Sequence, residues 1–170
     1  MKKTAIVTGS SRGIGFAIAR QLGLHGYNIV MVATGPQEKN QAAVDALQKQ
    51  GVCCAYVQAN IGDHDDRLRI LDAALTAFGR VDALVNNAFW HADEQPPLHE
   101  VTLEDWDRHL DLNLRCHFIV CKHVIPHLLA QPESVIVNIG TTGARRGEDG
   151  YAAYAAAKAG LESLTRSIAA

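Results

Sequence analysis

The sequence predicts an α/β protein with a doubly wound parallel sheet between two layers of helices. Short apolar runs alternate along the chain with longer segments of helical periodicity, as in successive strand–helix–strand units. The apolar runs lack a polar residue at every second position, which is typical of parallel strands covered on both faces. The first run also leads directly into a glycine-rich turn at residues 8–15. Right-handed crossovers then favour a three-layer α/β/α arrangement.

Five strands and five helices follow from these patterns. Strands are expected over residues 4–7, 28–33, 52–59, 81–85 and 134–139. Helices are expected over residues 14–24, 37–50, 63–78, 102–129 and 151–170, with a glycine-rich stretch at 140–150. Asp63 and Thr102 are expected to cap the helices that they precede, and Gly79 to close the third.

Two helices show a clear apolar stripe. Ile14, Ile18 and Leu22 recur at helical spacing in the first, so this stripe is expected to face the sheet. Val44 and Leu47 are expected to point inward from the second.

Composition limits the classes of function. The 170 residues predict one domain over residues 1–170, and 48% hydrophobic residues suffice for a core. The net charge of −2 gives no electrostatic reason to expect nucleic acid or an acidic membrane as a partner. No apolar run approaches the roughly 20 residues that span a bilayer, and no signal-peptide core is present. The expected location is cytoplasmic.

Cysteines and histidines give little support for a metal site. The four cysteines are Cys53, Cys54, Cys116 and Cys121, and without a Cys-x-x-Cys pair they are expected to be reduced packing residues. His123 and His127 lie four apart on an expected helix, but no glutamate or third ligand completes a zinc pattern. No metal is predicted.

The turn at residues 8–15 is predicted to bind the phosphates of a dinucleotide. It has the spacing Gly9-x-x-x-Gly13-x-Gly15 between a strand and a helix. Glycines permit the tight turn, the approach of backbone amides to a pyrophosphate, and close helix–strand packing. The helix N-terminus then faces the phosphates. A plain glycine-rich turn is the alternative, and the flanking strand and helix argue against it.

The residues around this turn favour NADP(H) over NAD(H). A site for NAD usually has an acidic residue after the second strand, whereas this strand ends in Val32-Ala33-Thr34. Arg12 in the glycine turn can meet a 2′-phosphate in charge and geometry. A solvated turn residue is the alternative for Arg12, so NAD(H) stays open.

Tyr154 and Lys158 form the candidate chemical motif. They lie four residues apart on the last helix and share a face. An ammonium beside a phenol favours the phenolate, so the pKa of Tyr154 is expected to be lowered and the hydroxyl to serve as a general acid or base. Alone, this spacing would fit two unrelated surface residues.

With these motifs together, the chain resembles the short-chain dehydrogenase/reductases, especially the 3-oxoacyl-acyl-carrier-protein reductase-like members. The resemblance rests on Thr8-Gly9-x-x-x-Gly13-x-Gly15, Asn86-Asn87-Ala88, Asn113 and Tyr154-x-x-x-Lys158, and it covers essentially the whole chain. It implies a Rossmann-type fold, and a single dinucleotide-binding and catalytic domain.

The resemblance also implies roles for individual residues. Tyr154 would exchange a proton with the substrate oxygen, Lys158 would hold the nicotinamide ribose, and Asn113 would position a water in a relay to Lys158. Thr34 would help with the 2′-phosphate, and Asn60 would contact adenine. The implied cofactor site comprises Gly9, Ser11, Arg12, Gly13, Ile14, Gly15, Thr34, Asn60, Ile61, Asn86, Ala88, Tyr154 and Lys158.

Three departures from the family pattern matter. The family's substrate-orienting serine falls at Thr141, which keeps a hydroxyl; Thr142 is a weaker candidate. Phe89 replaces a glycine after Ala88, which is costly if the position needs positive φ; local repacking is favoured over a role in lining the cleft. The chain also stops at Ala170, before the family's last strands and substrate loop, so it is expected to be a fragment.

The predicted function is NADP(H)-dependent interconversion of a carbonyl and an alcohol on a small molecule. Alternatives are a truncated binding module without turnover and an NAD-dependent alcohol dehydrogenase. A homo-oligomer, dimer or tetramer, is expected by resemblance through the helix that starts near Thr102 and the last helix.

Overall fold

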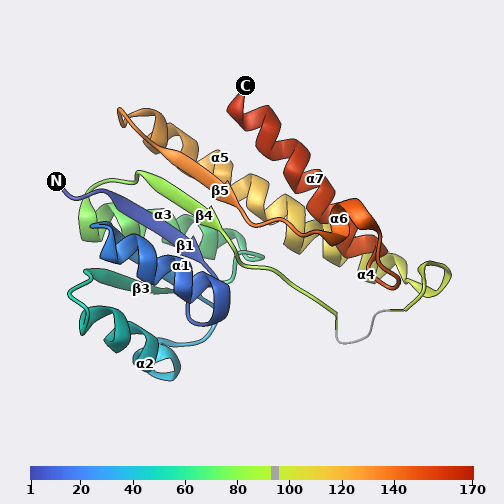
Figure 1. Ribbon diagram of the computed structural model, residues 1–170, viewed down its shortest axis with the longest axis horizontal. Coiled ribbons are helices and arrows are strands. Elements are labelled where there is room, and N and C mark those ends of the chain that lie inside the picture. Colours follow the sequence, from blue (N-terminus) through green and yellow to red (C-terminus); the bar gives the residue numbers. More distant parts are fainter. Residues whose placement is uncertain (93–95) are drawn as a thin grey trace. The chain divides into compact units, whose positions relative to one another are not determined.

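The computed structural model describes residues 1–92 and 96–170, and its strands form one sheet in the order β3-β2-β1-β4-β5 (Figure 1). The strands are β1 (Thr4–Thr8), β2 (Asn28–Ala33), β3 (Cys54–Gln58), β4 (Ala83–Asn86) and β5 (Val135–Asn138). The helices are α1 (Gly13–Leu24), α2 (Gln37–Gln48), α3 (His64–Phe78), α4 (Leu103–Leu110), α5 (Cys116–Leu129), α6 (Gly143–Arg146) and α7 (Ala152–Ala169).

The strand order reverses direction at β1. β1 pairs in parallel with β2 and with β4, and β2 pairs in parallel with β3. Right-handed crossovers place α1 and α2 on one face of the sheet and α3 on the other, as Figure 1 shows. The doubly wound α/β class is therefore confirmed. In such folds ligands bind beyond the carboxyl ends of the strands at the reversal point, where β1 leads into the glycine turn and β4 into Asn87.

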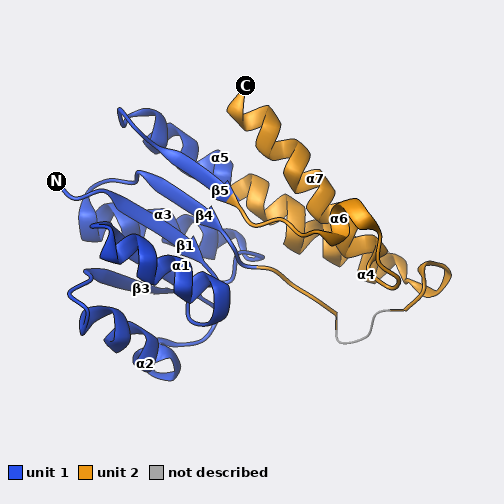
Figure 2. Cartoon of the chain, in the orientation of Figure 1, with its two compact units in different colours: residues 1–88, 120–137 blue, residues 89–119, 138–170 orange. Residues whose placement is uncertain are grey.

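Contacts divide the chain into two compact units (Figure 2). The first, residues 1–88 and 120–137, contains nearly all of the sheet and the glycine turn. The second, residues 89–119 and 138–170, contains α4, α6 and α7. The motifs identified in the sequence are thus shared between two units, and each unit is described by itself below.

Local signals in the sequence set several boundaries as expected. Asp63 accepts hydrogen bonds from the N–H groups of Asp65 and Asp66, and Thr102 accepts one from Asp105 N–H. Gly79 ends α3 in the left-handed conformation, with φ of 72°. Every residue of β1 is buried, which confirms a strand covered on both faces. No helix among the described residues is long and apolar enough to cross a bilayer.

The expected apolar stripe of α1 is wrong. Ile14 is 66% exposed, whereas the buried residues of α1 are Gly15 and Ala19. The helix approaches the sheet so closely at its start that a branched side chain has no room there. In α2, by contrast, Val44 and Leu47 are buried as expected.

Four local features differ from the sequence-based expectations. The helix expected over residues 102–129 contains a π-helical turn at Asp111–Arg115, between α4 and α5. Residues 98–100 form a 3-10 turn, and the glycine-rich stretch at 140–150 contains the short helix α6. All four cysteines are free thiols; Cys116 and Cys121 are buried, but Cys53 is exposed and so does not pack in the core.

Candidate active site

The glycine turn of the first unit has the geometry that its spacing predicts. Gly9 and Gly13 have positive φ, of 65° and 56°. A Cβ added to Gly15 would lie 2.3 Å from Gly9 O and 2.4 Å from Asn87 Nδ2. Gly9 and Gly13 are therefore required for the turn itself, and Gly15 is required for the close approach of α1 to the end of β1.

Asn87 and Thr8 hold this turn against the segment that follows β4. Asn87 Nδ2 donates to Thr8 O (2.9 Å) and to Gly9 O (3.2 Å). Thr8 Oγ1 accepts from the N–H groups of Asn87 and Ala88, both at 3.0 Å. A further link joins Ser10 to β2, since Ser10 Oγ accepts from Val32 N–H at 3.0 Å. The turn is thus fixed before any ligand arrives.

The N-terminus of α1 suits an anion. Arg12 is the N-cap residue, no side chain caps the helix, and the first turn carries no acidic residue. The first amide groups of a helix need acceptors and carry the positive end of its dipole. Phosphate oxygens can meet that need, and the glycine cradle leaves room for them. The residues present therefore fit a dinucleotide. Ser11, Arg12, Gly13 and Ile14 surround this helix start, and all except Ser11 are exposed.

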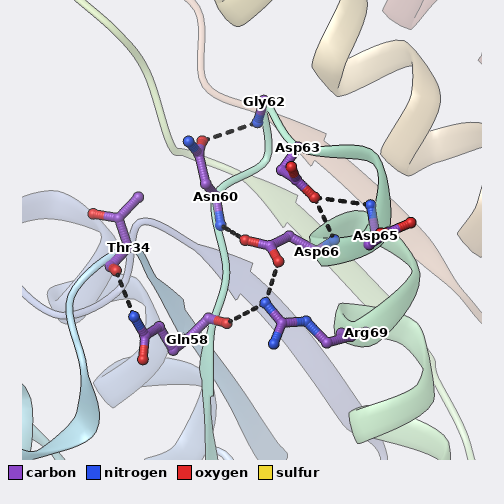
Figure 3. A network of polar contacts seen from close by, with 8 residues as sticks. All are labelled: Thr34, Gln58, Asn60, Gly62, Asp63, Asp65, Asp66 and Arg69. Carbon is purple, nitrogen blue, oxygen red and sulfur yellow. Dashed lines mark hydrogen bonds and ion pairs between the residues drawn. The ribbon is translucent and has the colours of Figure 1, made fainter.

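Thr34 and Asn60 lie in a polar network at the ends of β2 and β3 (Figure 3). Gln58 Nε2 donates to Thr34 O at 3.4 Å, while Asn60 N–H donates to Asp66 Oδ2 at 2.7 Å. Arg69 bridges Asp66 and the carbonyl oxygen of Gln58. The network fixes the backbone on which Thr34 and Asn60 are presented, and both residues are exposed.

Asn60 also organises the start of the loop that follows β3. Its Oδ1 accepts from Gly62 N–H at 3.0 Å, so this oxygen is already used within the loop. Ile61 is buried, and its carbonyl oxygen accepts from Arg67 Nη1 at 2.7 Å. Of the pair, Asn60 presents the polar surface, and Ile61 anchors the loop.

Asn86, Ala88 and Phe89 play different parts after β4. The Asn86 side chain is buried and donates to Cys121 Sγ on α5 at 3.2 Å, so it ties β4 to a helix. Ala88 lies against Gly9, 3.0 Å from the Cβ that this glycine lacks. Phe89 is 61% exposed, and no described residue other than glycine has positive φ. The substitution of Phe89 for glycine therefore causes no backbone strain here.

In the second unit, Tyr154 and Lys158 share a face of α7. Lys158 is 1% exposed, and its ammonium lies 5.9 Å from the ring centre of Tyr154. Lys158 Nζ donates to Ile139 O at 2.9 Å. Burial lowers the pKa of Lys158 to about 8, so the side chain is mostly cationic at pH 7.

The expected lowering of the Tyr154 pKa is wrong for this structure. Burial raises the pKa of Tyr154, and the nearby Tyr151 raises it further. The Lys158 ammonium, 5.9 Å from the centre of the Tyr154 ring, does not reverse this upward shift of the pKa. Tyr154 is consequently a neutral proton donor at rest, and the nearby cation becomes important only once the hydroxyl loses its proton.

Asn113 lies in the π-helical turn and is fully buried. Its Oδ1 accepts from Trp90 N–H at 2.9 Å, and its Nδ2 donates to Trp90 O at 3.0 Å. The side chain thus binds the backbone of the loop after β4. A water relay through Asn113 remains a prediction, and it would have to use atoms other than this amide oxygen.

Thr141 lies between β5 and α6 and is half-buried. Its hydroxyl oxygen accepts from Gly143 N–H at 3.3 Å, which leaves the hydroxyl proton free to be donated. Thr142 is exposed. Thr141 as the hydroxyl that orients a bound substrate, with Thr142 as the weaker candidate, remains a prediction.

Sequence reasoning missed several residues that hold these groups. Asn87 has a signal in the Asn-Asn-Ala triplet, although its role became visible only with the turn. His91 and His109 lie beside Tyr154, and Trp90 packs against His109; of the two histidines, only His109 had a detectable signal, four residues before Asn113. Among the described residues no group of three His, Cys, Asp or Glu side chains is arranged to hold a metal ion.

The sequence profile of a family described as short chain dehydrogenase matches residues 3–170. This chain belongs to the short-chain dehydrogenase family. The predictions of an oxidoreductase and of a Rossmann-type fold are therefore confirmed. The chain is 37% identical over 169 residues to 3-oxoacyl-[acyl-carrier-protein] reductase FabG of Staphylococcus aureus, covering 99% of this chain and 68% of that protein.

Two solved structures of the family show the same fold. A metagenomic short-chain oxidoreductase in complex with NADP has a TM-score of 0.89 and 33% identity, over 98% of this chain and 75% of that one. A 3-oxoacyl-[acyl-carrier protein] reductase from Brucella melitensis in complex with NAD has a TM-score of 0.91 and 29% identity, over 99% and 67%. The family therefore includes proteins of this shape with either dinucleotide.

Proposed function

We propose that this short-chain dehydrogenase reduces a small-molecule carbonyl, with Tyr154 as the proton donor. The observation that carries the proposal is the pairing of a half-buried, neutral Tyr154 with a buried, cationic Lys158 on one face of α7. A general acid must be protonated at rest, and its conjugate base must be stabilised as the proton leaves. The two side chains meet these two requirements.

The glycine turn supports a dinucleotide as the redox partner. Gly9, Gly13 and Gly15 would admit its pyrophosphate, and the uncapped N-terminus of α1 would bind the negative charge. When bound, the nicotinamide supplies hydride to the carbonyl carbon. Tyr154 would supply the proton to the oxygen, Thr141 would orient that oxygen, and Lys158 would hold the ribose.

Replacing Tyr154 tests the proposal. In Tyr154→Phe the proton donor is lost, and general acid catalysis of this kind contributes roughly 10²–10⁴-fold, so we expect a fall in kcat of that order. NADPH oxidation with a panel of ketones measures it. Tyr151→Phe, at the N-cap of the same helix, is the matched control and should stay within about threefold. Equal rates in wild type and Tyr154→Phe would exclude this role for Tyr154.

The same assay separates enzyme from binding module. Calorimetry would show NADPH binding in both cases, but a module would show no turnover with any ketone. Absence of NADPH binding would count against both functions.

We further propose a preference for NADP(H) over NAD(H). Arg12 is exposed at the start of α1, and β2 leads into Thr34-Gly35-Pro36-Gln37 without an acidic residue. A charge-assisted hydrogen bond between Arg12 and a 2′-phosphate is worth about 1.5–3 kcal/mol, or roughly 10–100-fold in Kd. NAD(H) lacks that phosphate.

The cofactor preference is tested by calorimetry on Arg12→Ala. We expect the Kd for NADPH to rise by roughly tenfold or more while the Kd for NADH stays within about twofold. Arg20→Ala, further along α1 and bonded to Gln50, is the control. Equal weakening of both cofactors would remove the argument for a 2′-phosphate site and favour the NAD-dependent alternative.

A homo-oligomer is proposed through the α4 side of the second unit. A groove of about 520 Å³ is lined there by Asp107, Arg108, Leu110, Asp111, Leu114 and Arg115. The lining contains both charges beside leucines, which suits a self-complementary two-fold contact. Light scattering on Leu114→Glu would show smaller particles than wild type if this groove forms the contact, and unchanged particles otherwise.

A further inference from the structure

Aromatic and imidazole rings surround Tyr154 in the second unit. The ring centre of His109 lies 6.1 Å from that of Tyr154 and 4.7 Å from that of Trp90. The His91 ring centre lies 5.7 Å from Tyr154. His109 is 4% exposed and comes from α4, one turn before Asn113. None of the roles described above uses this buried imidazole.

Trp90 fixes the orientation of the Asn113 amide. The N–H of Trp90 can only donate and its carbonyl can only accept, so Oδ1 must face the former and Nδ2 the latter. A flipped Asn113 amide would place its NH₂ group against the Trp90 N–H and its oxygen against the Trp90 carbonyl oxygen. The assignment of the two amide atoms, which hydrogen-bond geometry must always supply, is therefore unambiguous.

The oriented amide then determines the tautomer of His109. Asn113 Nδ2 lies 3.3 Å from His109 Nδ1, and an amide nitrogen only donates. Nδ1 must accept, so the single proton of the neutral ring is on Nε2. A proton added to Nδ1 would face the N–H groups of Asn113 and break this contact.

We propose that His109 is a positioning residue that works only as the neutral Nε2–H tautomer, bracing Asn113 and Trp90 beside Tyr154. The role rests on the proposed function of Tyr154 as the general acid. Protonation of His109 disconnects it from Asn113 and loosens the loop at Trp90. Reduction should then slow in acid, although Tyr154 itself stays protonated there.

The charges around His109 keep it neutral near pH 7. Burial lowers the pKa of His109, and His91 in the loop lowers it further. Asp105, one turn earlier on α4, opposes them by raising this pKa, yet the net shift is downward from 6.5.

Two further cations and one ion pair lie near these rings in the part of the chain that the structure describes. The Arg108 guanidinium lies 4.5 Å from the ring centre of Trp90, and the Lys158 ammonium lies on the α7 side of Tyr154. In the π-helical turn, Asp111 pairs with Arg115 at 2.9 Å. Burial raises the pKa of Tyr154, so its hydroxyl is neutral at this pH. The pKa of His109 is therefore held below its ordinary value, mainly by burial.

Tryptophan fluorescence tests the tautomer without relying on turnover. An imidazolium beside an indole quenches its emission, and Trp106→Phe leaves Trp90 as the reporter. We expect emission to fall as the pH drops, with a midpoint below 6.5. His109→Asn should remove this titration, while His91→Asn and the exposed His99→Asn should keep it. A midpoint at or above 6.5, or a titration that survives His109→Asn, would overturn the proposal.

The pH profile of kcat tests the consequence for reduction. Wild-type kcat should fall in acid with the same midpoint as the fluorescence. His109→Asn keeps an acceptor near Asn113 but does not titrate, so its kcat should stay within about threefold of wild type and lose the acid decline. His109→Leu removes the acceptor and should lower kcat by about tenfold, which corresponds to about 1.4 kcal/mol in the barrier, with an unchanged KM for NADPH.

The two experiments fail in different ways. If Tyr154→Phe keeps full activity, the proposed function is lost, and so is the catalytic consequence of His109, while the fluorescence midpoint still reports the tautomer. If Tyr154→Phe is inactive but His109→Leu and His109→Asn match wild type at every pH, only the positioning role is overturned.

Discussion

At the scale of single residues, function and stability conflict at Lys158. The side chain is cationic near pH 7 and almost fully buried, and its ammonium donates a hydrogen bond to Ile139 O. Its pKa of about 8, against 10.5 in the unfolded chain, corresponds to about 3 kcal/mol lost on burying the charge. Such a cost is expected where a charge is kept for chemistry rather than for folding.

Lys158→Met should therefore stabilise the protein without bound dinucleotide. We expect a gain of about 2 kcal/mol in unfolding free energy at pH 7, after subtracting about 1 kcal/mol for the hydrogen bond to Ile139. Urea denaturation measures it, and the exposed Lys122→Met is the control.

The stability difference between Lys158→Met and wild type should depend on pH in a definite direction. Between pH 8 and 10.5 the folded state binds fewer protons than the unfolded state, so wild-type stability rises with pH and the advantage of Lys158→Met shrinks. A variant less stable than wild type at pH 7, or an advantage that does not change with pH, would show that burial of the charge is not costly.

At the scale of elements, the start of α1 combines two different glycine requirements. Gly13 needs positive φ but has nothing within 4 Å of an added Cβ. Gly15 has ordinary helical geometry, but an added Cβ would collide with Gly9 O and Asn87 Nδ2. The same three-glycine spacing thus reflects a backbone requirement at one position and a packing requirement at another.

Alanine substitutions should separate these requirements. Gly13→Ala should cost about 1 kcal/mol from its conformation alone. Gly15→Ala should cost about 2–3 kcal/mol through overpacking, despite the better helix propensity of alanine, and should weaken dinucleotide binding more than Gly13→Ala does. Urea midpoints and calorimetric Kd values measure both effects. Equal losses would mean that the close approach of α1 is not rigid.

The elements also show where sequence reasoning succeeds. Strands and capped helices were predictable because apolar runs, Asp63, Gly79 and Thr102 act through their near neighbours. The face of α1 was not, because the sheet approaches it so closely that small residues, rather than Ile14, are buried. The π-helical turn at Asp111–Arg115 contains Asn113, whose side chain binds Trp90, 23 positions away, and no local sequence pattern predicts such a contact.

The candidate site likewise contains some features that the sequence predicts and others that it does not. The glycine turn and the Tyr154–Lys158 pair could be predicted from the sequence because their chemistry requires these residue types at this spacing. The pKa of Tyr154 was not, since burial and Tyr151 decide it, and both depend on tertiary packing. The ring cluster of Trp90, His91 and His109 brings a loop and α4 against α7, so the sequence alone could not predict it.

At the scale of the whole sheet, Asp82 links the amino-terminal ends of three strands, which lie at the opposite end of the sheet from the glycine turn. Its Oδ2 accepts from Thr4 N–H at 2.8 Å and from Arg80 Nε at 2.9 Å. Its carbonyl oxygen accepts from Val135 N–H at 3.0 Å, at the start of β5. Burial tends to raise the pKa of Asp82, but the hydrogen bonds from Arg80 and Thr4 outweigh it and hold the pKa below its usual value.

Asp82→Asn should weaken the sheet in a pH-dependent way. A carboxylate with a lowered folded-state pKa stabilises the protein above the unfolded pKa, near 3.9, and this contribution is lost as the pH falls through the folded pKa. We expect the variant to lose about 2–3 kcal/mol at pH 7, because a buried charged partner of Arg80 is removed. The difference from wild type should shrink steadily in urea denaturations between pH 5 and pH 3. The exposed Asp72→Asn on α3 should show neither effect, and a loss at Asp82 that is the same at every pH would assign the stabilisation to shape and hydrogen bonding instead of charge.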